Sequence, residues 1–115
     1  MTLDDWLLYF EKLHPSAIDM GLERVKKVSD ALGMTPAFPV ITVAGTNGKG
    51  SVCAMLESIL CRASYQVGCY TSPHLLHYGE RIRIDQHVVT DEVLCNVFAE
   101  IESVRQSLQF TLTYF

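Results

Sequence analysis

The sequence has no cluster of basic residues and no long apolar run. Its 9 Lys and Arg residues are outnumbered by 13 Asp and Glu residues, which gives a formal net charge of −4. A chain without a basic patch lacks the electrostatic footprint of a nucleic-acid-binding protein, so we expect no nucleic-acid partner. No stretch of about 18 apolar residues occurs, so we expect no membrane span. The acidic start of the chain differs from the basic start of a secretory signal peptide.

The cysteines form no metal-binding or disulfide pattern. None of Cys53, Cys61, Cys69 and Cys95 belongs to a Cys-x-x-Cys pair, and no histidine lies at zinc-ligand spacing from a cysteine pair. Cys53 and Cys61 would lie about 12 Å apart on one helix, which is too far for a disulfide. We therefore expect free thiols and a cytoplasmic location.

Apolar residues recur at helical spacing in several segments of this 115-residue chain, of which 49% is apolar. Residues 3–13 predict a first helix with Thr2 as its N-cap, and residues 21–32 predict a second helix that Gly33 ends. Residues 52–63 predict a third helix with one buried face, and a fourth follows Thr90. The glutamates on these helices are expected at the surface: Glu57, Glu100 and Glu102.

Short apolar runs at residues 39–43 and 65–70 predict two buried strands on either side of the third helix. A strand–helix–strand unit implies a parallel sheet with a right-handed crossover. Residues 81–85 alternate like a half-exposed strand, and residues 110–115 are strand-like too. The expected fold class is α/β, a parallel sheet flanked by helices. It is incomplete, because such a sheet needs several strands covered on both faces.

Residues 44–51 (AGTNGKGS) lie between the first predicted strand and the third helix. Glycines let backbone N–H groups turn inward, the helix start adds positive potential, and Lys49 can reach the outer phosphates of a nucleotide. The loop is a short variant of the general phosphate-binding motif, with its hydroxyl moved to Ser51. The segment predicts an ATP site, and the alternative is a glycine-rich turn without a ligand.

Three segments together resemble one family, the dihydrofolate synthase/folylpolyglutamate synthase enzymes, which are relatives of the Mur peptide ligases. They are residues 18–25 (IDMGLERV), 43–51 (VAGTNGKGS) and 70–75 (YTSPHL). Residues 79–83 (GERIR) and 112–115 (LTYF) also look like this family. The glycine loop alone would suggest any Mur-like ligase, and the other segments point to the folate branch.

The resemblance implies an ATP-dependent ligase that joins L-glutamate to 7,8-dihydropteroate and adds γ-linked glutamates to reduced folates. A substrate carboxylate takes the γ-phosphoryl group of ATP, and the glutamate amine then displaces phosphate from the acyl phosphate. The implied ligands are ATP, Mg²⁺ and these small molecules, and the intact protein is expected to be a monomer.

The resemblance also implies that the chain is an N-terminal fragment. Residues 1–38 would be a helical lead-in, and residues 39–115 would form the first part of a Mur-like ATP-binding domain. The later magnesium ligands and the C-terminal domain of the family have no counterpart here. We therefore expect the fragment itself to be inactive.

The family's contacts carry over to matching positions of this sequence. The phosphates would be held by Thr46, Asn47, Gly48, Lys49, Gly50 and Ser51, with Lys49 as the catalytic charge. Ser72 would ligate magnesium, or it would satisfy its own loop backbone. The pteroate would be contacted by Asp19, Met20, Gly21, Leu22, Thr113, Tyr114 and Phe115.

Several alternatives to these assignments stay open. Asp19 could instead cap the second helix, and the aromatic rings of Tyr114 and Phe115 could belong to the core of a strand. His74 and His77 do not form a convincing base beside Ser72, because no partner acid is evident. The chain could also belong to another Mur-like ligase, or be a nucleotide-binding module without chemistry of its own.

Overall fold

A computed structural model describes residues 1–14 and 21–114 of the chain. The chain divides into two compact units, which are described separately: Met1–Phe38 with Asp91–Phe115, and Pro39–Thr90. The predicted ATP-binding segment, residues 39–115, is divided between these units, since Asp91–Phe115 belongs to the unit of Met1–Phe38.

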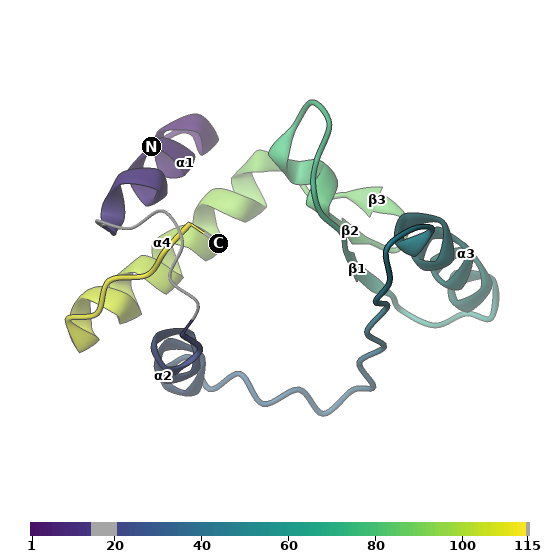
Figure 1. Ribbon diagram of the computed structural model, residues 1–115, viewed down its shortest axis with the longest axis horizontal. Coiled ribbons are helices and arrows are strands. Elements are labelled where there is room, and N and C mark those ends of the chain that lie inside the picture. The colour runs from purple at the N-terminus through teal and green to yellow at the C-terminus, as the bar shows by residue number, and fades with distance from the viewer. Residues whose placement is uncertain (15–20, 115) are drawn as a thin grey trace. The chain divides into compact units, whose positions relative to one another are not determined.

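The first unit is built from α1 (Leu3–Leu13), α2 (Glu23–Ala31) and α4 (Asp91–Leu108). Both α1 and α2 pack against α4 (Figure 1). Trp6 and Phe10 of α1 meet Phe98 of α4 edge-on, with ring centroids 6.3 and 5.1 Å apart. Such aromatic contacts add specific geometry to the burial of apolar area. Val28 of α2 and Leu94 of α4 are each 3% exposed and complete this core.

Local signals set the start of α1 and the end of α2, as the sequence predicted. The Thr2 hydroxyl accepts a hydrogen bond from the Asp5 amide at 3.2 Å, and the Asp5 carboxylate accepts one from the Thr2 amide at 2.9 Å. This reciprocal capping box satisfies two amides at the start of α1. After α2, Gly33 has a left-handed backbone with φ of 69°, and its amide donates to the Asp30 carbonyl at 3.0 Å. Glycine suits this position because it has no Cβ.

A charged network ties α1 to α4. Glu102 is only 6% exposed, and Nε and Nη2 of Arg105 donate hydrogen bonds to its carboxylate at 2.8 and 2.7 Å. The Tyr9 hydroxyl of α1 and the Gln106 amide each donate to Glu102 Oε1 at 2.7 Å. Hydrogen bonding to Arg105, helped by Tyr9 and Gln106, outweighs burial and lowers the pKa of Glu102 to about 2.

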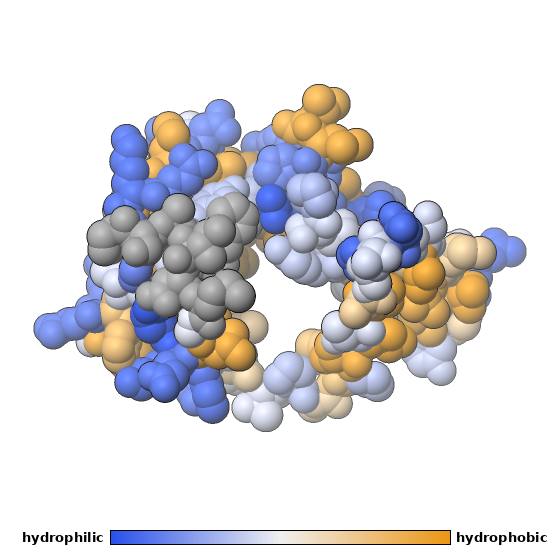
Figure 2. All heavy atoms as spheres, in the orientation of Figure 1, coloured by the Kyte–Doolittle hydropathy of each residue, from blue (hydrophilic) through white to orange (hydrophobic). Residues whose placement is uncertain are grey.

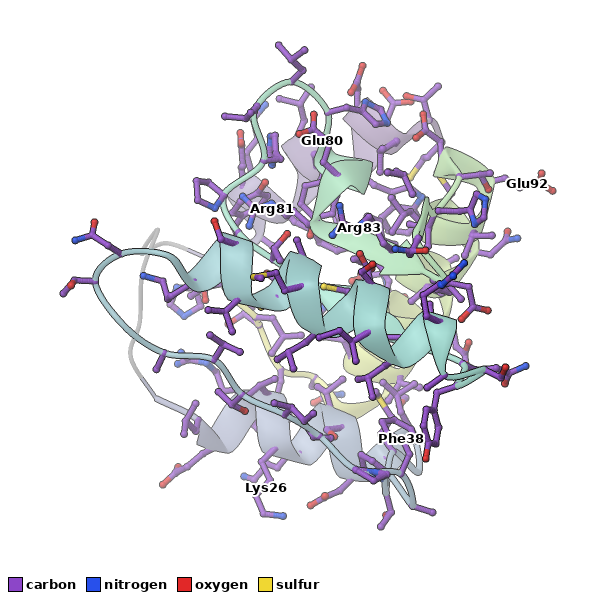
Figure 3. All side chains as sticks on the ribbon, turned by 90° about the vertical axis from the view of Figure 1, so that its right-hand side faces the viewer. Lys26, Phe38, Glu80, Arg81, Arg83 and Glu92 are labelled. Atoms are coloured by element: carbon purple, nitrogen blue, oxygen red, sulfur yellow. The ribbon has the colours of Figure 1, made fainter. Side chains whose placement is uncertain are left out.

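The second unit contains α3 (Lys49–Arg62), β1 (Gly68–Tyr70), the 3₁₀ helix η1 (Tyr78–Arg81), β2 (Ile82–Ile84) and β3 (His87–Val88). The strands form a sheet in the order β1-β2-β3, and both pairs are antiparallel. Glu57 of α3 is 4% exposed and pairs with Arg83 of β2 at 2.7 Å, which joins the helix to the sheet. Arg83 is labelled in Figure 3. The expected surface positions of Glu57 and Glu102 were therefore wrong, because each carboxylate has an arginine that lets it be buried.

The predicted α/β class is confirmed, and one feature of the sheet needs correction. The sheet of the described residues is antiparallel, and residues 39–43 form no strand in it. An extended segment becomes a strand only when a neighbour supplies the other half of the hydrogen-bond ladder. β2 finds that neighbour locally, through the tight turn at Asp85 and Gln86 that leads into β3. Residues 110–114 likewise form no strand.

Apolar side chains that were expected to be buried are exposed in the second unit. Val40 and Ile41 are 69% and 62% exposed, and Met55 and Ile59 of α3 are 66% and 62% exposed. Figure 2 shows apolar atoms gathered over the region of α3. The predicted apolar stripe of α3 is thus present, but this part of it is not covered by the described residues.

Among the described residues, no helix has the length and apolar character needed to cross a membrane.

We expect acid to destabilise the first unit through Glu102. Its folded pKa of about 2 lies below the ordinary value of 4.5, so its stabilising effect is complete above the ordinary value and is lost as the pH falls towards 2. The shift corresponds to about 3 kcal/mol at most. Denaturant unfolding followed by circular dichroism between about pH 7 and about pH 3 measures this loss.

Two variants separate Glu102 from other carboxylates. Glu102→Gln should unfold at lower denaturant near neutral pH and show a flatter pH dependence, because the titrating group is gone. Glu100→Gln changes an exposed carboxylate on the same helix and should keep the wild-type slope. Equal slopes for wild type and Glu102→Gln would contradict this account.

Candidate functional site

The glycine-rich loop ends in a residue whose backbone demands glycine. Gly48 is the N-cap of α3 and has a left-handed φ of 78°. A Cβ placed on Gly48 or on Gly50 would meet no atom within 4 Å, so the space over the start of the helix is open. Residues 44–51 are all exposed to solvent. Conformation rather than crowding therefore explains the glycine at position 48.

The start of α3 suits a negatively charged ligand. In the part of the chain that the structure describes, no side chain caps α3, and its first turn carries no acidic residue. The positive end of the helix dipole is therefore not neutralised there. Lys49 adds an ammonium group at the same end, and its Nζ donates to the Gly45 carbonyl across the loop. Backbone amides at a helix start together with a lysine can hold phosphate oxygens.

Ser72 lies in the same unit, in the loop between β1 and η1, and is exposed. Glu80 fixes the shape of this loop, because its carboxylate accepts hydrogen bonds from the backbone amides of Leu75, Leu76 and His77 at 3.1, 2.9 and 2.6 Å. These hydrogen bonds lower the pKa of Glu80, and the bond from the His77 amide has the largest effect. Glu80 is thus a positioning residue for the loop. Glu80 lies within the family-like residues 79–83, but the sequence pattern alone predicts no role for it.

Arg81 holds the first part of the same loop. Its Nε donates to His74 Nδ1 at 2.8 Å, and its guanidinium carbon lies 5.2 Å from the centre of the Tyr78 ring. Figure 3 shows Glu80 and Arg81 together on the ribbon of this region. Since His74 Nδ1 accepts a hydrogen bond, that nitrogen is already engaged in holding the loop. Within the described ranges, no group of three or more His, Cys, Asp or Glu side chains could hold a metal ion.

The expected pteroate contacts fall in the first unit. Gly21 and Leu22 directly precede α2, and Leu22 is its N-cap and 77% exposed. Thr113 and Tyr114 follow α4 and are half-buried. The structure therefore places two chain segments that are distant in sequence within one unit. Asp19, Met20 and Phe115 lie outside the described residues, as does the alternative capping role of Asp19.

Removing the charge of Glu80 should loosen the loop that carries Ser72. Glu80→Gln leaves only a neutral amide oxygen facing three backbone amides, so we expect faster hydrogen–deuterium exchange at Leu75, Leu76 and His77. Glu92→Gln, at an exposed position of α4, is the matched control (Figure 3). Unchanged exchange at these three amides in Glu80→Gln would contradict the proposed role of Glu80.

Comparison with known proteins finds close relatives along the whole chain. No protein-family model matches it. The "Dihydrofolate synthase/folylpolyglutamate synthase" of Escherichia coli (strain K12) is 52% identical over 114 residues, which cover 98% of this chain and 26% of that protein.

Solved structures agree with this similarity. The E. coli enzyme in complex with DHPP and ADP matches 100% of this chain and 28% of its own, with a TM-score of 0.93 and 51% identity. A bifunctional folylpolyglutamate synthase/dihydrofolate synthase with Mn, AMPPNP and L-glutamate bound matches with a TM-score of 0.89 and 46% identity, over 100% of this chain and 27% of its own. The present chain thus spans about a quarter of the length of the proteins it matches.

Proposed function

Because the chain belongs to the dihydrofolate synthase/folylpolyglutamate synthase family, we propose that it is the phosphate-binding part of an ATP-dependent ligase. The ligase joins L-glutamate to 7,8-dihydropteroate and adds further γ-linked glutamates to reduced folates, with ADP and phosphate as products. The observation that carries the proposal is the open start of α3, which no described side chain caps, with Lys49 beside it. The bound ADP, AMPPNP and L-glutamate of similar enzymes support the same ligands here.

In this proposal residues 46–51 hold the phosphates of ATP. Gly48 turns the chain so that the first amides of α3 face one anion, and Lys49 exchanges the neutral Gly45 carbonyl for a charged phosphate oxygen. A hydrogen bond between two charged groups is stronger than one to a carbonyl, so this exchange favours binding. The same charge neutralises the oxygens of the γ-phosphoryl group during its transfer.

The reaction then needs two steps at the substrate carboxyl group. A carboxylate oxygen bonds to the γ-phosphorus while the bond from that phosphorus to the β,γ-bridging oxygen breaks, which releases ADP and leaves an acyl phosphate. The amine of L-glutamate next attacks the carboxyl carbon and loses a proton, and the C–O bond breaks to release phosphate. The contribution of this chain is to position and neutralise phosphate oxygens.

We assign to Ser72 one oxygen contact to Mg²⁺. When bound, magnesium neutralises phosphate charge, and it accepts hydroxyl, phosphate and water oxygens as ligands. The exposed hydroxyl of Ser72, in a loop held by Glu80 and Arg81, fits such a contact. The pteroate would lie against Gly21, Leu22, Thr113 and Tyr114, with Asp19, Met20 and Phe115. The proposal includes a monomeric intact protein in the cytoplasm.

The intact protein that carries this sequence should release phosphate only when ATP, dihydropteroate and L-glutamate are all present. The 115-residue chain by itself should release none, because it spans about a quarter of its relatives. A phosphate-release assay with each substrate omitted in turn tests both statements. Turnover by the 115-residue chain would overturn the fragment assignment. Stimulation by a different carboxylate substrate would favour another Mur-like ligase, and ATP binding without turnover would favour a nucleotide-binding module.

Lys49→Ala should weaken ATP binding in the intact protein and lower kcat. A hydrogen bond to a charged group contributes about 1.5–3 kcal/mol, so we expect the Kd for ATP to rise by about 10-fold or more. Lys26→Ala is the control, because Lys26 (Figure 3) is an exposed lysine of α2. Its ammonium pairs with the Asp30 carboxylate, which is exposed as well, at 2.9 Å. Calorimetry of ATP binding gives the measurement. Equal ATP affinity in Lys49→Ala and wild type would contradict the assignment.

A further inference from the structure

The chain that follows α4 is held at Phe110 by two cations from different helices. Arg105 of α4 donates from Nη1 to the Phe110 carbonyl. Lys27 of α2 places its Nζ 4.6 Å from the centre of the Phe110 ring. Just before this point the backbone turns at Gln109, which has a left-handed φ of 58°. Phe110 is therefore held on its backbone by one helix and on its ring by another.

Arg105 can hold Phe110 in a fixed place because Arg105 is itself immobilised. Its Nε and Nη2 are both committed to the Glu102 carboxylate, and its side chain is only 11% exposed. Tyr9 of α1 donates to the same carboxylate at 2.7 Å. The remaining nitrogen, Nη1, is thereby directed at the Phe110 carbonyl. A lysine could not make these contacts together, because its ammonium is a single point rather than a planar fork.

Phe110 lies three residues before Thr113, and Thr113 is the first of the residues after α4 that are proposed to contact the pteroate. Lys27 is on α2, whose N-cap Leu22 belongs to the other pteroate segment. The contact between Lys27 and Phe110 therefore links the helix that begins at one segment to the chain that leads into the other. These two segments are far apart in the sequence but lie in one unit.

We propose that Arg105 and Lys27 are positioning residues for the pteroate side of the substrate site. Through Phe110 they set where residues 110–114 lie relative to the start of α2, and neither residue itself touches substrate. The inference rests on the proposed function. It predicts a selective effect, since both residues belong to the first unit and the phosphate loop belongs to the second.

The test compares substitutions at neighbouring lysines of α2 in the intact protein. Lys27→Met removes the cation over Phe110 but keeps a long apolar side chain, and Lys27 is exposed, so no buried group loses a partner. An exposed cation–π contact contributes about 0.5–1 kcal/mol, so the KM for dihydropteroate should rise about 2- to 5-fold while the KM for ATP stays unchanged. Lys27→Arg keeps the cation and should restore the wild-type value. Lys26→Met is the matched control and should change neither KM.

Arg105→Lys provides the second and larger effect. This variant keeps a positive charge beside Glu102 but loses the planar guanidinium that bonds Glu102 and the Phe110 carbonyl together. The KM for dihydropteroate should therefore rise about 10-fold or more, again without a change in the KM for ATP. Circular dichroism and thermal unfolding establish that each variant is folded. Should Arg105→Lys fail to fold, the three lysine variants decide the proposal alone.

The outcomes separate this inference from the proposed function. If the wild-type protein does not use dihydropteroate, the proposed function fails before any variant is compared. If wild type uses it and folded Lys27→Met keeps the wild-type KM for dihydropteroate, the positioning role is overturned. A parallel rise in both KM values, or no rescue by Lys27→Arg, would also overturn it, since either result indicates a general loss of structure.

Discussion

Glu57 and Glu102 are buried carboxylates, and each is held by the guanidinium of an arginine at 2.7 Å. A charge removed from water is costly unless an opposite charge and hydrogen bonds replace its hydration. The Glu57–Arg83 pair can form only when α3 packs on the sheet, and the Glu102 network is complete only when α1 brings Tyr9 to α4. The internal geometry of each unit therefore depends on one such pair.

The Glu57–Arg83 pair also relates the two parts of the proposed phosphate site. Glu57 lies on the helix that begins with Lys49, and Arg83 lies on β2, which pairs with β1. β1 ends at Tyr70, just before the loop that carries Ser72. A change in how α3 packs on β2 would therefore move the start of the helix relative to that loop. The exposed residues that would meet the ligand are placed by a buried contact that never touches it.

Features that depend on neighbouring residues could be predicted from the sequence, and features that depend on distant partners could not. The cap at Thr2, the stop at Gly33 and the glycine at Gly48 follow from local backbone geometry, which the residue type alone reveals. The apolar run at residues 39–43 showed that the segment suits a strand, but a strand also needs a partner, and within the described ranges no strand pairs with this run. Glutamates on helices are usually exposed, and Arg105 and Gln106 could pair with Glu102 on an exposed helix face as well. Burial of Glu102 follows only when α1 packs on α4 and brings Tyr9 to it. The roles of individual site residues stay predictions.

Lys49 illustrates why a phosphate site can be proposed from the sequence before the structure is known. Its ammonium is exposed and occupied by the Gly45 carbonyl of its own loop, so the protein keeps a cation at the start of α3 without burying a charge. In the proposed site a phosphate oxygen would replace that carbonyl at little cost, because a charged acceptor would take the place of a neutral one and the ammonium has not been moved out of water. Such a site needs only a left-handed glycine, free helix amides and a lysine, all adjacent in the sequence. The proposed pteroate side has no such local requirement, since its segments are brought into one unit by helix packing and by the contacts of Arg105 and Lys27 with Phe110.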